Sequence, residues 1–399
     1  MHHVVILGGS YGGIAALRRV QINRDVRVTL VDHHPYHYLQ TEGYELISGD
    51  TYFDKTIVNL STLCANYENV TFRHSSVEHI DPETKSVHLS DGIEMYDTLI
   101  IALGSVTKRF QCDARVYNYS SGAKSLRGAL KLNRFFQDEL YKRLESARYA
   151  KENFNIIVGG AGLSGVEIAA SMQHFFNHYY RSNTLSCETL NIHLIASRET
   201  ILFGMPRKII ETGTRRLDKL SVNIHTNCRI SAIDGHETVM SNGERIPFDF
   251  MIFAGGTTIN PVLESLNTKK NEKGQFLVDA YLRSLCYEDI YIIGDAACLK
   301  DKRGNMLPPT AMTAIESGRD AAENIIRTLK KTALKRANLK IKGIAIALGG
   351  KYAVIDLKFI YVSGYSAYLI KKFIEKIYKW PLWWLTYKGY KKMKACKLG

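Results

Sequence analysis

Two glycine-rich segments are the parts of this sequence whose residue types and spacing most directly suggest chemistry. Gly8-Gly9-Ser10-Tyr11-Gly12-Gly13 and Gly160-Ala161-Gly162-Leu163-Ser164-Gly165 each follow a short apolar run and precede a helical pattern. In such a loop the glycines let the backbone approach a pyrophosphate, and the following helix offers free N–H groups and a positive dipole end. The sequence therefore predicts two phosphate-binding loops.

The first loop departs from the G-x-G-x-x-G pattern at its middle glycine, where Ser10 stands. Serine is the smallest substitute that leaves a backbone N–H available. Asp32 ends the next apolar run, 24 residues after Gly8, where a carboxylate can accept both hydroxyls of a ribose. The alternative is an ordinary glycine-rich turn between a strand and a helix, and the context favours nucleotide binding.

The second loop has all three glycines of the pattern, but no acidic residue ends the strand that follows it. Ala196, Ser197 and Arg198 stand there instead. A 2′-phosphate would meet no repelling carboxylate, and Ser197 and Arg198 offer it donors, which predicts use of NADPH or of both NADH and NADPH. The alternative is a solvated Arg198, with the ribose held by backbone and water. We expect NADPH to be oxidised at least as well as NADH.

A third chemical signal is Gly294-Asp295, which follows the apolar run at residues 290–293. Together with the two loops and the Ala102-Leu103-Gly104 turn, it suggests that the chain returns to its first unit. Asp295 would then bond the ribityl chain of FAD. The alternative role for Asp295 is to cap the N-terminus of a helix.

The elements that must position these residues form a pattern that occurs twice, about 152 residues apart. Each copy contains a strand, a glycine loop, a helix and a second strand, at residues 4–7, 14–21 and 26–31 and again at 155–158, 164–180 and 191–195. Similar short strands follow both copies, at residues 70–74, 86–89 and 98–104 and at 222–225, 238–241 and 249–256. This order predicts an α/β fold with two doubly wound, Rossmann-like dinucleotide-binding domains. The length of 399 residues agrees with two to three domains at roughly 150 residues each.

The C-terminal part carries the charge asymmetry of the chain. Residues 330–399 contain 17 Lys and Arg but only two acids, which gives this part a net charge of +15. The whole chain carries +14, so residues 1–329 together carry −1. Residues 330–342 are a basic linker, and residues 366–379 form an amphipathic helix that we expect Pro381 to end. Three Trp lie among the Lys of the tail, which favours an anionic membrane surface over nucleic acid or a solvated tail.

Composition excludes several classes of protein. Apolar residues make up 45% and charged residues 23% of the chain, and its mean hydropathy is −0.15, which is ordinary for a globular protein. No run approaches the roughly 18 apolar residues of a spanning helix.

The seven cysteines form no C-x-x-C pair, so a disulfide scaffold or zinc site is unsupported. Cys286 and Cys298 suggest ordinary buried thiols. No signal peptide fits the N-terminus, so we expect a cytoplasmic protein.

With these motifs in place, the chain resembles the type II NADH dehydrogenases (NADH:quinone oxidoreductases), which are flavoproteins with two dinucleotide-binding domains. The resemblance rests on segments that span nearly the whole chain in the family's order. They are residues 6–13, 36–42, 158–167, 294–295, 308–311 and 347–350. It implies an FAD-binding domain at residues 1–110 and 258–330, an NAD(P)H-binding domain at 111–257, and a C-terminal membrane-associating region at 331–399.

The resemblance also implies roles for individual residues. Glu167 would act in catalysis by relaying a proton or orienting the dinucleotide near the nicotinamide and flavin, although a Glu favoured by the helix dipole is the alternative. Lys371 and Lys372 match a lysine pair near the family's acceptor channel, although a solvated helix face is at least as good an explanation. The residues expected to hold FAD are Gly8, Gly9, Ser10, Tyr11, Gly12, Gly13, Asp32, His33, Thr41, Glu42, Val77, Ala102, Leu103, Gly104, Gly294, Asp295, Thr310 and Ala311. Those expected to hold NADH or NADPH are Gly160, Gly162, Leu163, Ser164, Gly165, Ser197, Arg198, Gly255 and Gly256, and those expected to bind quinone are Met312, Ile315, Glu316 and Lys371.

Two departures from the family leave alternatives open. The family carries Ala-Gln-x-Ala-x-Gln beside the quinone, and this chain has Met312 and Glu316 at the two glutamine positions. The acid expected at position 196 is also missing. The expected function is a non-proton-pumping NAD(P)H:quinone oxidoreductase, peripheral on the cytoplasmic side of the inner membrane and a homodimer. The alternatives are a soluble flavin reductase with another acceptor, a flavoprotein that binds nucleic acid, and a sulfide:quinone reductase. The last is disfavoured because residues 156–172 and 343–357 contain no cysteine.

Overall fold

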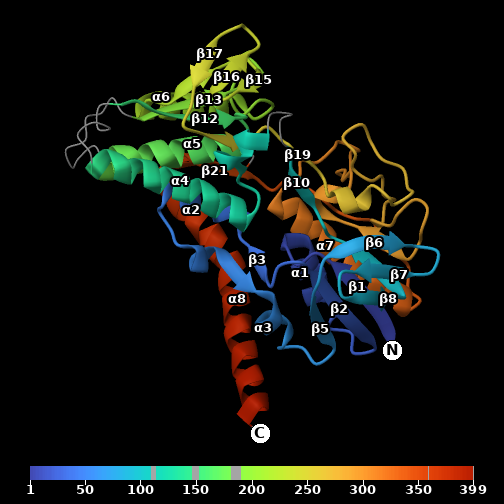
Figure 1. Ribbon diagram of the computed structural model, residues 1–399. Helices are drawn as coiled ribbons and strands as arrows, with labels where there is room; N and C mark the ends of the chain where they lie inside the picture. The colour runs from blue at the N-terminus through green and yellow to red at the C-terminus, as the bar shows by residue number, and fades with distance from the viewer. Residues whose placement is uncertain (109–113, 146–151, 181–189, 358, 399) are drawn as a thin grey trace.

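The computed structural model of the chain describes residues 1–108, 114–145, 152–180, 190–357 and 359–398. Two lobes are built around two five-stranded parallel sheets (Figure 1). The chain enters the second lobe through β10 (Ser105–Thr107) and leaves it through β19 (Thr257–Ile259), and these two strands pair with each other in antiparallel register. The predicted α/β fold with two Rossmann-like units is confirmed.

The first sheet has the strand order β20-β9-β1-β2-β5. Its strands are β20 (Ile290–Ile292), β9 (Thr98–Ile101), β1 (His2–Leu7), β2 (Val26–Asp32) and β5 (Val70–His74). Helices α1 (Tyr11–Val20) and α7 (Ala311–Leu329) cover one face and cross closely, because a Cβ on Gly318 would lie 2.2 Å from the Gly12 carbonyl oxygen. The central strands are fully buried, as their continuous apolar sequences predict.

Smaller elements extend the first lobe between and after these strands. They are β3 (Tyr36–Tyr38), η1 (Gln40–Glu42), α2 (Gly43–Ser48), η2 (Phe53–Thr56), β4 (Ile57–Asn59), α3 (Leu60–Cys64), β6 (Val77–Asp81), β7 (Ser86–Leu89), β8 (Gly92–Met95), η7 (Pro261–Leu263) and η8 (Gly294–Ala296). Strand β3 pairs with β4, and β6, β7 and β8 form an antiparallel sheet. These pieces place residues 36–48 beside the second lobe, where α2 packs on α4 and α5.

The second sheet has the strand order β11-β18-β12-β13-β14, which corresponds strand by strand to the order of the first sheet. Its strands are β11 (Ser120–Gly122), β18 (Phe250–Phe253), β12 (Phe154–Gly159), β13 (Leu190–Ile195) and β14 (Asn223–His225). Helices α4 (Leu126–Glu145), α5 (Leu163–Phe175) and α6 (Arg207–Leu220), the π-helical turn η5 (Phe176–Tyr180), η3 (Ala114–Asn118) and the antiparallel strands β15 (Ile230–Asp234), β16 (Glu237–Met240) and β17 (Arg245–Pro247) complete the lobe.

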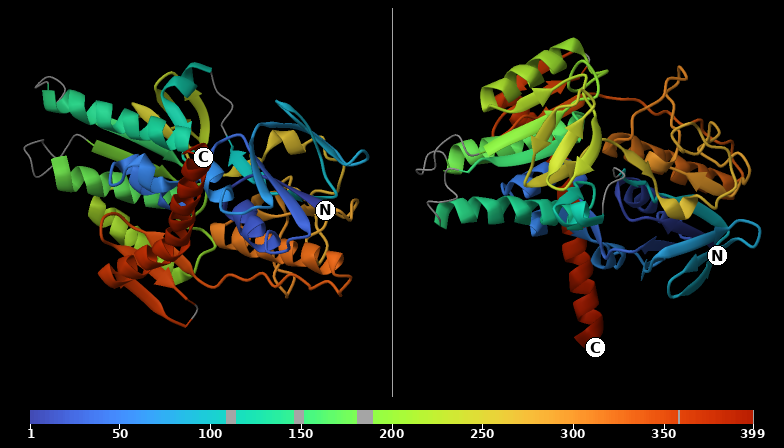
Figure 2. Two further views of the ribbon diagram at one scale, coloured as in Figure 1. Left: turned by 90° about the horizontal axis from the view of Figure 1, so that it is seen from below. Right: turned by 45° about the horizontal axis from the view of Figure 1, so that its top comes forward.

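The C-terminal part forms a three-stranded antiparallel sheet and one long helix. The strands are β21 (Ile344–Ala347), β22 (Ala353–Asp356) and β23 (Tyr361–Gly364), and the helix is α8 (Tyr365–Leu398). Helix α8 runs past the junction of the lobes and extends away from both (Figure 2). Among the described helices, none combines the length and apolar character that crossing a bilayer requires.

The expectation that Pro381 ends the amphipathic helix is wrong, because α8 continues through it. Proline lacks the N–H that would bond the carbonyl of Ile377. Ile377 is 58% exposed, so water can satisfy that carbonyl. On the far side of the proline, Trp383 donates from its indole to the Ile57 carbonyl and Asn66 donates to the Leu385 carbonyl, which fixes the second half of the helix.

The two faces of α8 are arranged opposite to those of an ordinary surface helix. The charged residues Lys371 and Glu375 are buried, at 7% and 8% exposure. The apolar residues of the opposite face are exposed, and they are Leu369, Ile370, Phe373, Ile374, Ile377, Trp380, Trp384 and Tyr387. A solvated charged face is therefore the wrong interpretation of Lys371. The expected burial of Cys286 is also wrong, since Cys286 lies exposed in the loop before β20, whereas Cys298 is buried.

Candidate functional site

The first glycine loop joins β1 to α1 at the carboxyl end of the first sheet. A Cβ on Gly13 would lie only 1.8 Å from the Gly8 carbonyl oxygen, so the loop can close only with glycine there. Ser10 occupies the N-cap of α1 in extended backbone, with φ −100°, a conformation open to any residue. This explains why serine can replace the middle glycine of the pattern.

Asp32, at the end of β2, is held beside this loop. Its carboxylate accepts hydrogen bonds from the backbone N–H groups of Gly9 at 2.6 Å and His34 at 2.8 Å, and His33 Nδ1 lies 3.4 Å away. Burial opposes ionisation of Asp32, but the hydrogen bonds from His33, Gly9 and His34 outweigh it and lower its pKa. The structure thus brings an ionised acceptor to the loop, as a ribose site requires. Val77 lies half-buried on β6, the first strand after β5.

Asp295 faces the link between the lobes. Its Oδ2 accepts hydrogen bonds from Ser105 Oγ at 2.7 Å and from Lys124 Nζ at 2.6 Å. The short helix η8 has Ile293 as its N-cap, without a side-chain hydrogen bond, so the alternative role of Asp295 as a cap is not observed. Gly104, just before Ser105, has open space where a Cβ would stand.

The second glycine loop repeats the geometry of the first. A Cβ on Gly165 would lie 1.8 Å from the Gly160 carbonyl oxygen, the same separation as in the first loop. Gly162 is the N-cap of α5, in the place that Ser10 has in α1, and nothing lies within 4 Å of its would-be Cβ. Gly162 and Ser164 are exposed, so the loop presents an open cradle next to a helix N-terminus.

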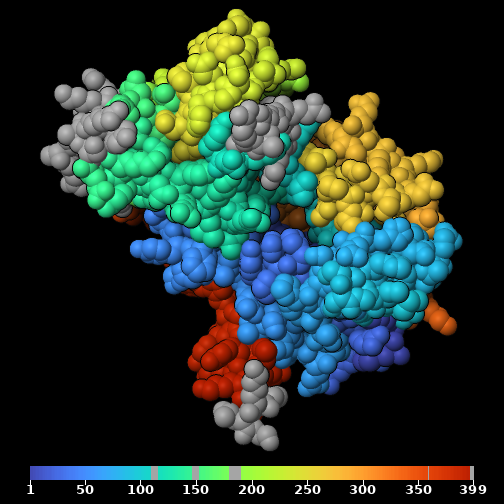
Figure 3. Space-filling view, in the orientation of Figure 1, coloured from blue at the N-terminus to red at the C-terminus, as the bar shows by residue number. Residues whose placement is uncertain are grey.

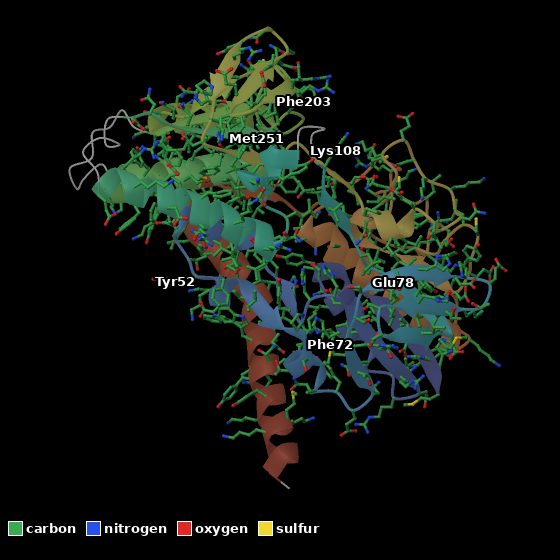
Figure 4. The ribbon with its side chains drawn as sticks, in the orientation of Figure 1. Tyr52, Phe72, Glu78, Lys108, Phe203 and Met251 are labelled. Atoms are coloured by element: carbon green, nitrogen blue, oxygen red, sulfur yellow. The ribbon has the colours of Figure 1, made fainter. Side chains whose placement is uncertain are left out.

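The end of β13 presents a cation instead of an acid. Ala196 is buried, whereas Ser197 and Arg198 are exposed. The Arg198 guanidinium carbon lies 5.2 Å from the centre of the Phe203 ring, and Phe203 is itself 54% exposed (Figure 4). Gly255 and Gly256 follow β18 on the same sheet, and both are exposed or half-exposed. The arrangement suits a ribose that carries a phosphate.

Glu167 lies in the first turns of α5 and belongs to a cluster of charges at the junction of the lobes. Its Oε1 accepts a hydrogen bond from the Ala347 backbone N–H at 3.0 Å and lies 3.5 Å from Lys371 Nζ. Burial raises the pKa of Glu167 despite the nearby ammonium of Lys371. Lys371 also bonds Glu375 at 2.9 Å and stacks over Tyr44. This carboxyl therefore binds a proton at a higher pH than an exposed glutamate does.

The cluster continues from α8 to α2 and the first lobe. Lys372 donates to Glu375 at 2.9 Å and also pairs with Glu45, and Lys379 pairs with Glu42. Burial opposes the charge on Glu375, but Lys371 and Lys372 outweigh it and lower its pKa. Burial raises the pKa of Glu42 and of Glu45. The polar face of α8 thus joins the two lobes through buried ion pairs.

Thr41 lies just before Glu42 and contacts Tyr11, which packs in an aromatic cluster with His37 and Tyr378, two residues that the sequence analysis did not assign to a site. Its hydroxyl is 2.9 Å from the Tyr11 hydroxyl of the first loop. The Tyr11 ring packs edge-on against His37, with 4.6 Å between ring centres, and Tyr378 of α8 bonds His37 Nε2 at 3.1 Å. Burial lowers the pKa of His37 to about 3, so its ring is neutral.

The residues expected at the acceptor lie at the start of α7. Thr310 caps this helix together with Thr313. Ala314 is in contact range of the first loop, since a Cβ on Gly12 would lie 3.2 Å from its carbonyl oxygen. Glu316 pairs with Lys342 at 2.6 Å, and the Met312 sulfur accepts the Lys342 backbone N–H. Glu316 therefore adds no unbalanced charge, and it faces the linker at residues 340–342.

Comparison with known proteins supports the family resemblance and the two-lobed fold. Residues 2–318 match the family described as pyridine nucleotide-disulphide oxidoreductase. A demethylphylloquinone reductase from Synechocystis sp. is 28% identical, covering 95% of this chain and 92% of its own. A type II NADH:quinone oxidoreductase from Haemophilus influenzae is 24% identical, covering 90% and 87%. Among solved structures, NDH2 from Plasmodium falciparum in complex with NADH matches with a TM-score of 0.85 at 19% identity, covering 98% of each chain. The sulfide:quinone oxidoreductase of Aquifex aeolicus matches with 0.80 at 19% identity, covering 96% and 92%.

Proposed function

The chain belongs to the pyridine nucleotide-disulphide oxidoreductase family, and we propose that it is an FAD-dependent, non-proton-pumping NAD(P)H:quinone oxidoreductase. The observation that carries this proposal is the pair of equivalent glycine loops, one on each parallel sheet, with a buried charge cluster joining the lobes between them. Two dinucleotide sites in one chain are what a transfer from nicotinamide to flavin requires. The names of the relatives from Synechocystis sp. and Haemophilus influenzae support quinone as the acceptor.

FAD fits the first lobe by the chemistry of the donors present. The glycine loop at Gly8–Gly13, the ionised Asp32 and the carboxylate of Asp295 match a pyrophosphate, a ribose and a ribityl chain in turn. The FAD-binding domain comprises residues 1–110 and 258–330. The residues that would hold FAD are Gly8, Gly9, Ser10, Tyr11, Gly12, Gly13, Asp32, His33, Thr41, Glu42, Val77, Ala102, Leu103, Gly104, Gly294, Asp295, Thr310 and Ala311. When bound, FAD accepts a hydride and passes two electrons onward.

The reduced nicotinamide dinucleotide fits the second lobe, at residues 111–257. The loop Gly160–Gly165 takes its pyrophosphate, and Gly255 and Gly256 lie along its path. Ser197 and Arg198 hold the ribose and, in NADPH, the 2′-phosphate. Glu167 orients the dinucleotide or holds a proton at its carboxyl, which the raised pKa supports.

The quinone approaches between α7 and α8. Met312, Ile315 and Glu316 line its route from α7, and Lys371 lies on α8. Met312 and Glu316 stand where type II enzymes typically have glutamines. The Glu316–Lys342 ion pair leaves this wall of the quinone route without net charge. The wall is therefore suited to an apolar ring more than to a charged acceptor.

In this proposal, helix α8 makes the contact with the membrane. The lower half of this helix packs along α3 on one side and lies at the bottom of the molecule in the space-filling view (Figure 3). Its exposed face carries Trp380 and Trp384, and the ammonium groups of Lys376 and Lys388 lie over their rings. Aromatic rings beside lysines suit the interface of an anionic bilayer, where each Lys contributes about 1 kcal/mol. In this proposal the enzyme is peripheral, and residues 331–399 bind it to the cytoplasmic side of the inner membrane. The proposed assembly is a homodimer.

Anaerobic mixing tests the redox proposal. Purified protein should be yellow, lose its colour on adding NADH or NADPH, and regain it on adding a soluble quinone. Protein that stays colourless after FAD is supplied would end the proposal. Bleaching without recovery by quinone would instead point to a soluble reductase with another acceptor.

Flotation of the full chain with vesicles tests the membrane proposal. Binding to anionic vesicles should exceed binding to neutral ones, and a W380S/W384S variant should bind at least tenfold more weakly. Preference for duplex DNA over anionic vesicles would favour a protein that binds nucleic acid.

A further inference from the structure

Lys124 forms a contact that the nucleotide sites described above do not use. Its ammonium lies 2.6 Å from Asp295 Oδ2 and 2.5 Å from Ser105 Oγ. Ser105 in turn donates to the same carboxylate oxygen. The three side chains thus form a closed triangle of hydrogen bonds.

The triangle connects the two lobes at the hinge between them. Lys124 lies between β11 and α4 of the second lobe, whereas Asp295 lies in η8 of the first and Ser105 begins β10. The backbone of Gly122 also packs closely on β10 near this triangle. A Cβ on Gly122 would lie 2.4 Å from the side-chain oxygen Oγ1 of Thr107. Lys124 is therefore fixed by its own lobe and reaches across to the other.

Burial and unused donors make this contact suited to a ligand. The side chains of Lys124 and Asp295 are 22% and 19% exposed, so the pair is largely shielded and yet reachable. Within the described part of the chain, Asp295 Oδ1 accepts no hydrogen bond and Lys124 uses two of its three N–H donors. An acceptor and a donor remain available at the same place.

We propose that Lys124 is a positioning residue of the flavin site. It holds the Asp295 carboxylate in place for the ribityl chain and fixes the second lobe against the first. Its ammonium also lies beside the proposed cofactor site, and charge close to a flavin tunes its redox behaviour. This inference rests on the proposed function, because it assumes that the Asp295 side of the first lobe takes FAD.

The charge predicts an effect on potential that a purely structural contact would not have. Two-electron reduction makes the bound cofactor more negative, and the ammonium of Lys124 therefore stabilises the reduced form more than the oxidised form. If the loss of Lys124 weakens binding of the reduced form tenfold more than that of the oxidised form, the midpoint potential falls by about 30 mV.

The test compares Lys124→Met, Lys124→Arg and the control Lys108→Met, each in the full chain. Lys108 is an exposed lysine at the same hinge, near the end of β10 (Figure 4), so its loss makes the same change in net charge. The apoproteins are titrated with FAD, followed by quenching of its fluorescence, and the midpoint potential is measured with redox dyes. We expect K124M to bind FAD about tenfold more weakly and to have a lower potential, with K124R closer to wild type and K108M unchanged.

Asp295→Asn separates the proposed contact from an indirect effect. In the D295N background, K124M should weaken FAD binding much less than it does alone, because the pair is already broken. Equal FAD affinity and potential in wild type and K124M, with both yellow, would overturn the inference and leave the proposed function intact. Failure of wild-type apoprotein to bind FAD would overturn the proposed function itself. If K124M does not fold, Lys124→Gln takes its place, and a K124Q protein with the FAD affinity and midpoint potential of wild type would overturn the inference in the same way.

Discussion

The two lobes use one backbone design and differ in the charge placed at its edge. A Cβ on Gly13 or on Gly165 would lie 1.8 Å from the carbonyl oxygen of the first glycine in its loop, and the two sheets have corresponding strand orders. After the second strand, however, the first lobe places the ionised Asp32 and the second places the exposed Arg198. On the proposed assignment of the lobes, the loop supplies a general affinity for pyrophosphate, while one or two residues at the end of the next strand select the nucleotide.

The largest effect should come from closing either loop. Gly13→Ala and Gly165→Ala each place a Cβ 1.8 Å from a backbone oxygen that cannot move aside alone. Such crowding costs about 3 kcal/mol or more of local structure. We expect G13A to be purified without FAD, and G165A to stay yellow but to lose bleaching by NADH and NADPH. Absorbance spectra before and after adding the reductant measure both. A G165A protein that loses FAD while G13A keeps it would reverse the assignment of the lobes.

Making the second lobe like the first should give the next largest effect. Ala196→Asp restores a carboxylate at the end of β13, where it would repel a 2′-phosphate and accept ribose hydroxyls. We expect the ratio of kcat/KM for NADPH to that for NADH to fall by about 100-fold, since like charges cost several kcal/mol. Ala196→Asn is the control, because asparagine has nearly the size of aspartate without its charge. A wild-type enzyme that already strongly prefers NADH would contradict the premise.

Removing the cation at Arg198 should have a smaller and selective effect. A hydrogen bond to a charged group contributes about 1.5 to 3 kcal/mol, so R198A should lower kcat/KM for NADPH by roughly tenfold and leave that for NADH nearly unchanged. Phe203→Leu removes the ring under the guanidinium and keeps the charge. It should therefore have a weaker effect with the same selectivity. Equal losses with both nucleotides would show that Arg198 supports the loop and not the phosphate.

The lobes and their loops follow from the sequence because local patterns encode them. A strand, a glycine loop and a helix lie within about 30 residues of one another, and so do Gly8 and Asp32. Lys124 and Asp295 are 171 residues apart and form their pair only through the hinge. No local signal could have identified that contact. Glu375 could have been noticed, since it is one of only two acids in a strongly basic tail.

Helix α8 shows a second limit of sequence reasoning. Its two faces are evident from spacing, but the pattern does not say which face the protein buries. Glu42, Glu45 and Glu167 come from distant parts of the chain and attract the lysine face inward. Other tertiary contacts, those of Trp383 with Ile57 and of Asn66 with Leu385, fix the helix beyond Pro381, where local preference predicts an end.

The smallest effect concerns two histidines, the buried His37 in the first lobe and the half-buried His193 in the second. Burial lowers the pKa of His37 to about 3 and that of His193 to about 4. Because the unfolded chain binds a proton near pH 6.5 and the folded protein does not, stability is lost as pH falls from 6.5 toward these values. Each histidine contributes up to about 1.4 kcal/mol per pH unit in that range.

Substituting these histidines should therefore flatten the acid side of the stability profile. We expect His37→Gln, which keeps a partner for Tyr378, to reduce the loss in the free energy of unfolding between pH 6.5 and 5 by about 1 kcal/mol. His193→Gln should give a similar reduction over this interval but none below about pH 4, where His193 also titrates in the folded state. Urea unfolding at several pH values measures both. If H37Q follows the wild-type curve, His37 takes up a proton in the folded protein as readily as in the unfolded chain, and its lowered pKa is contradicted.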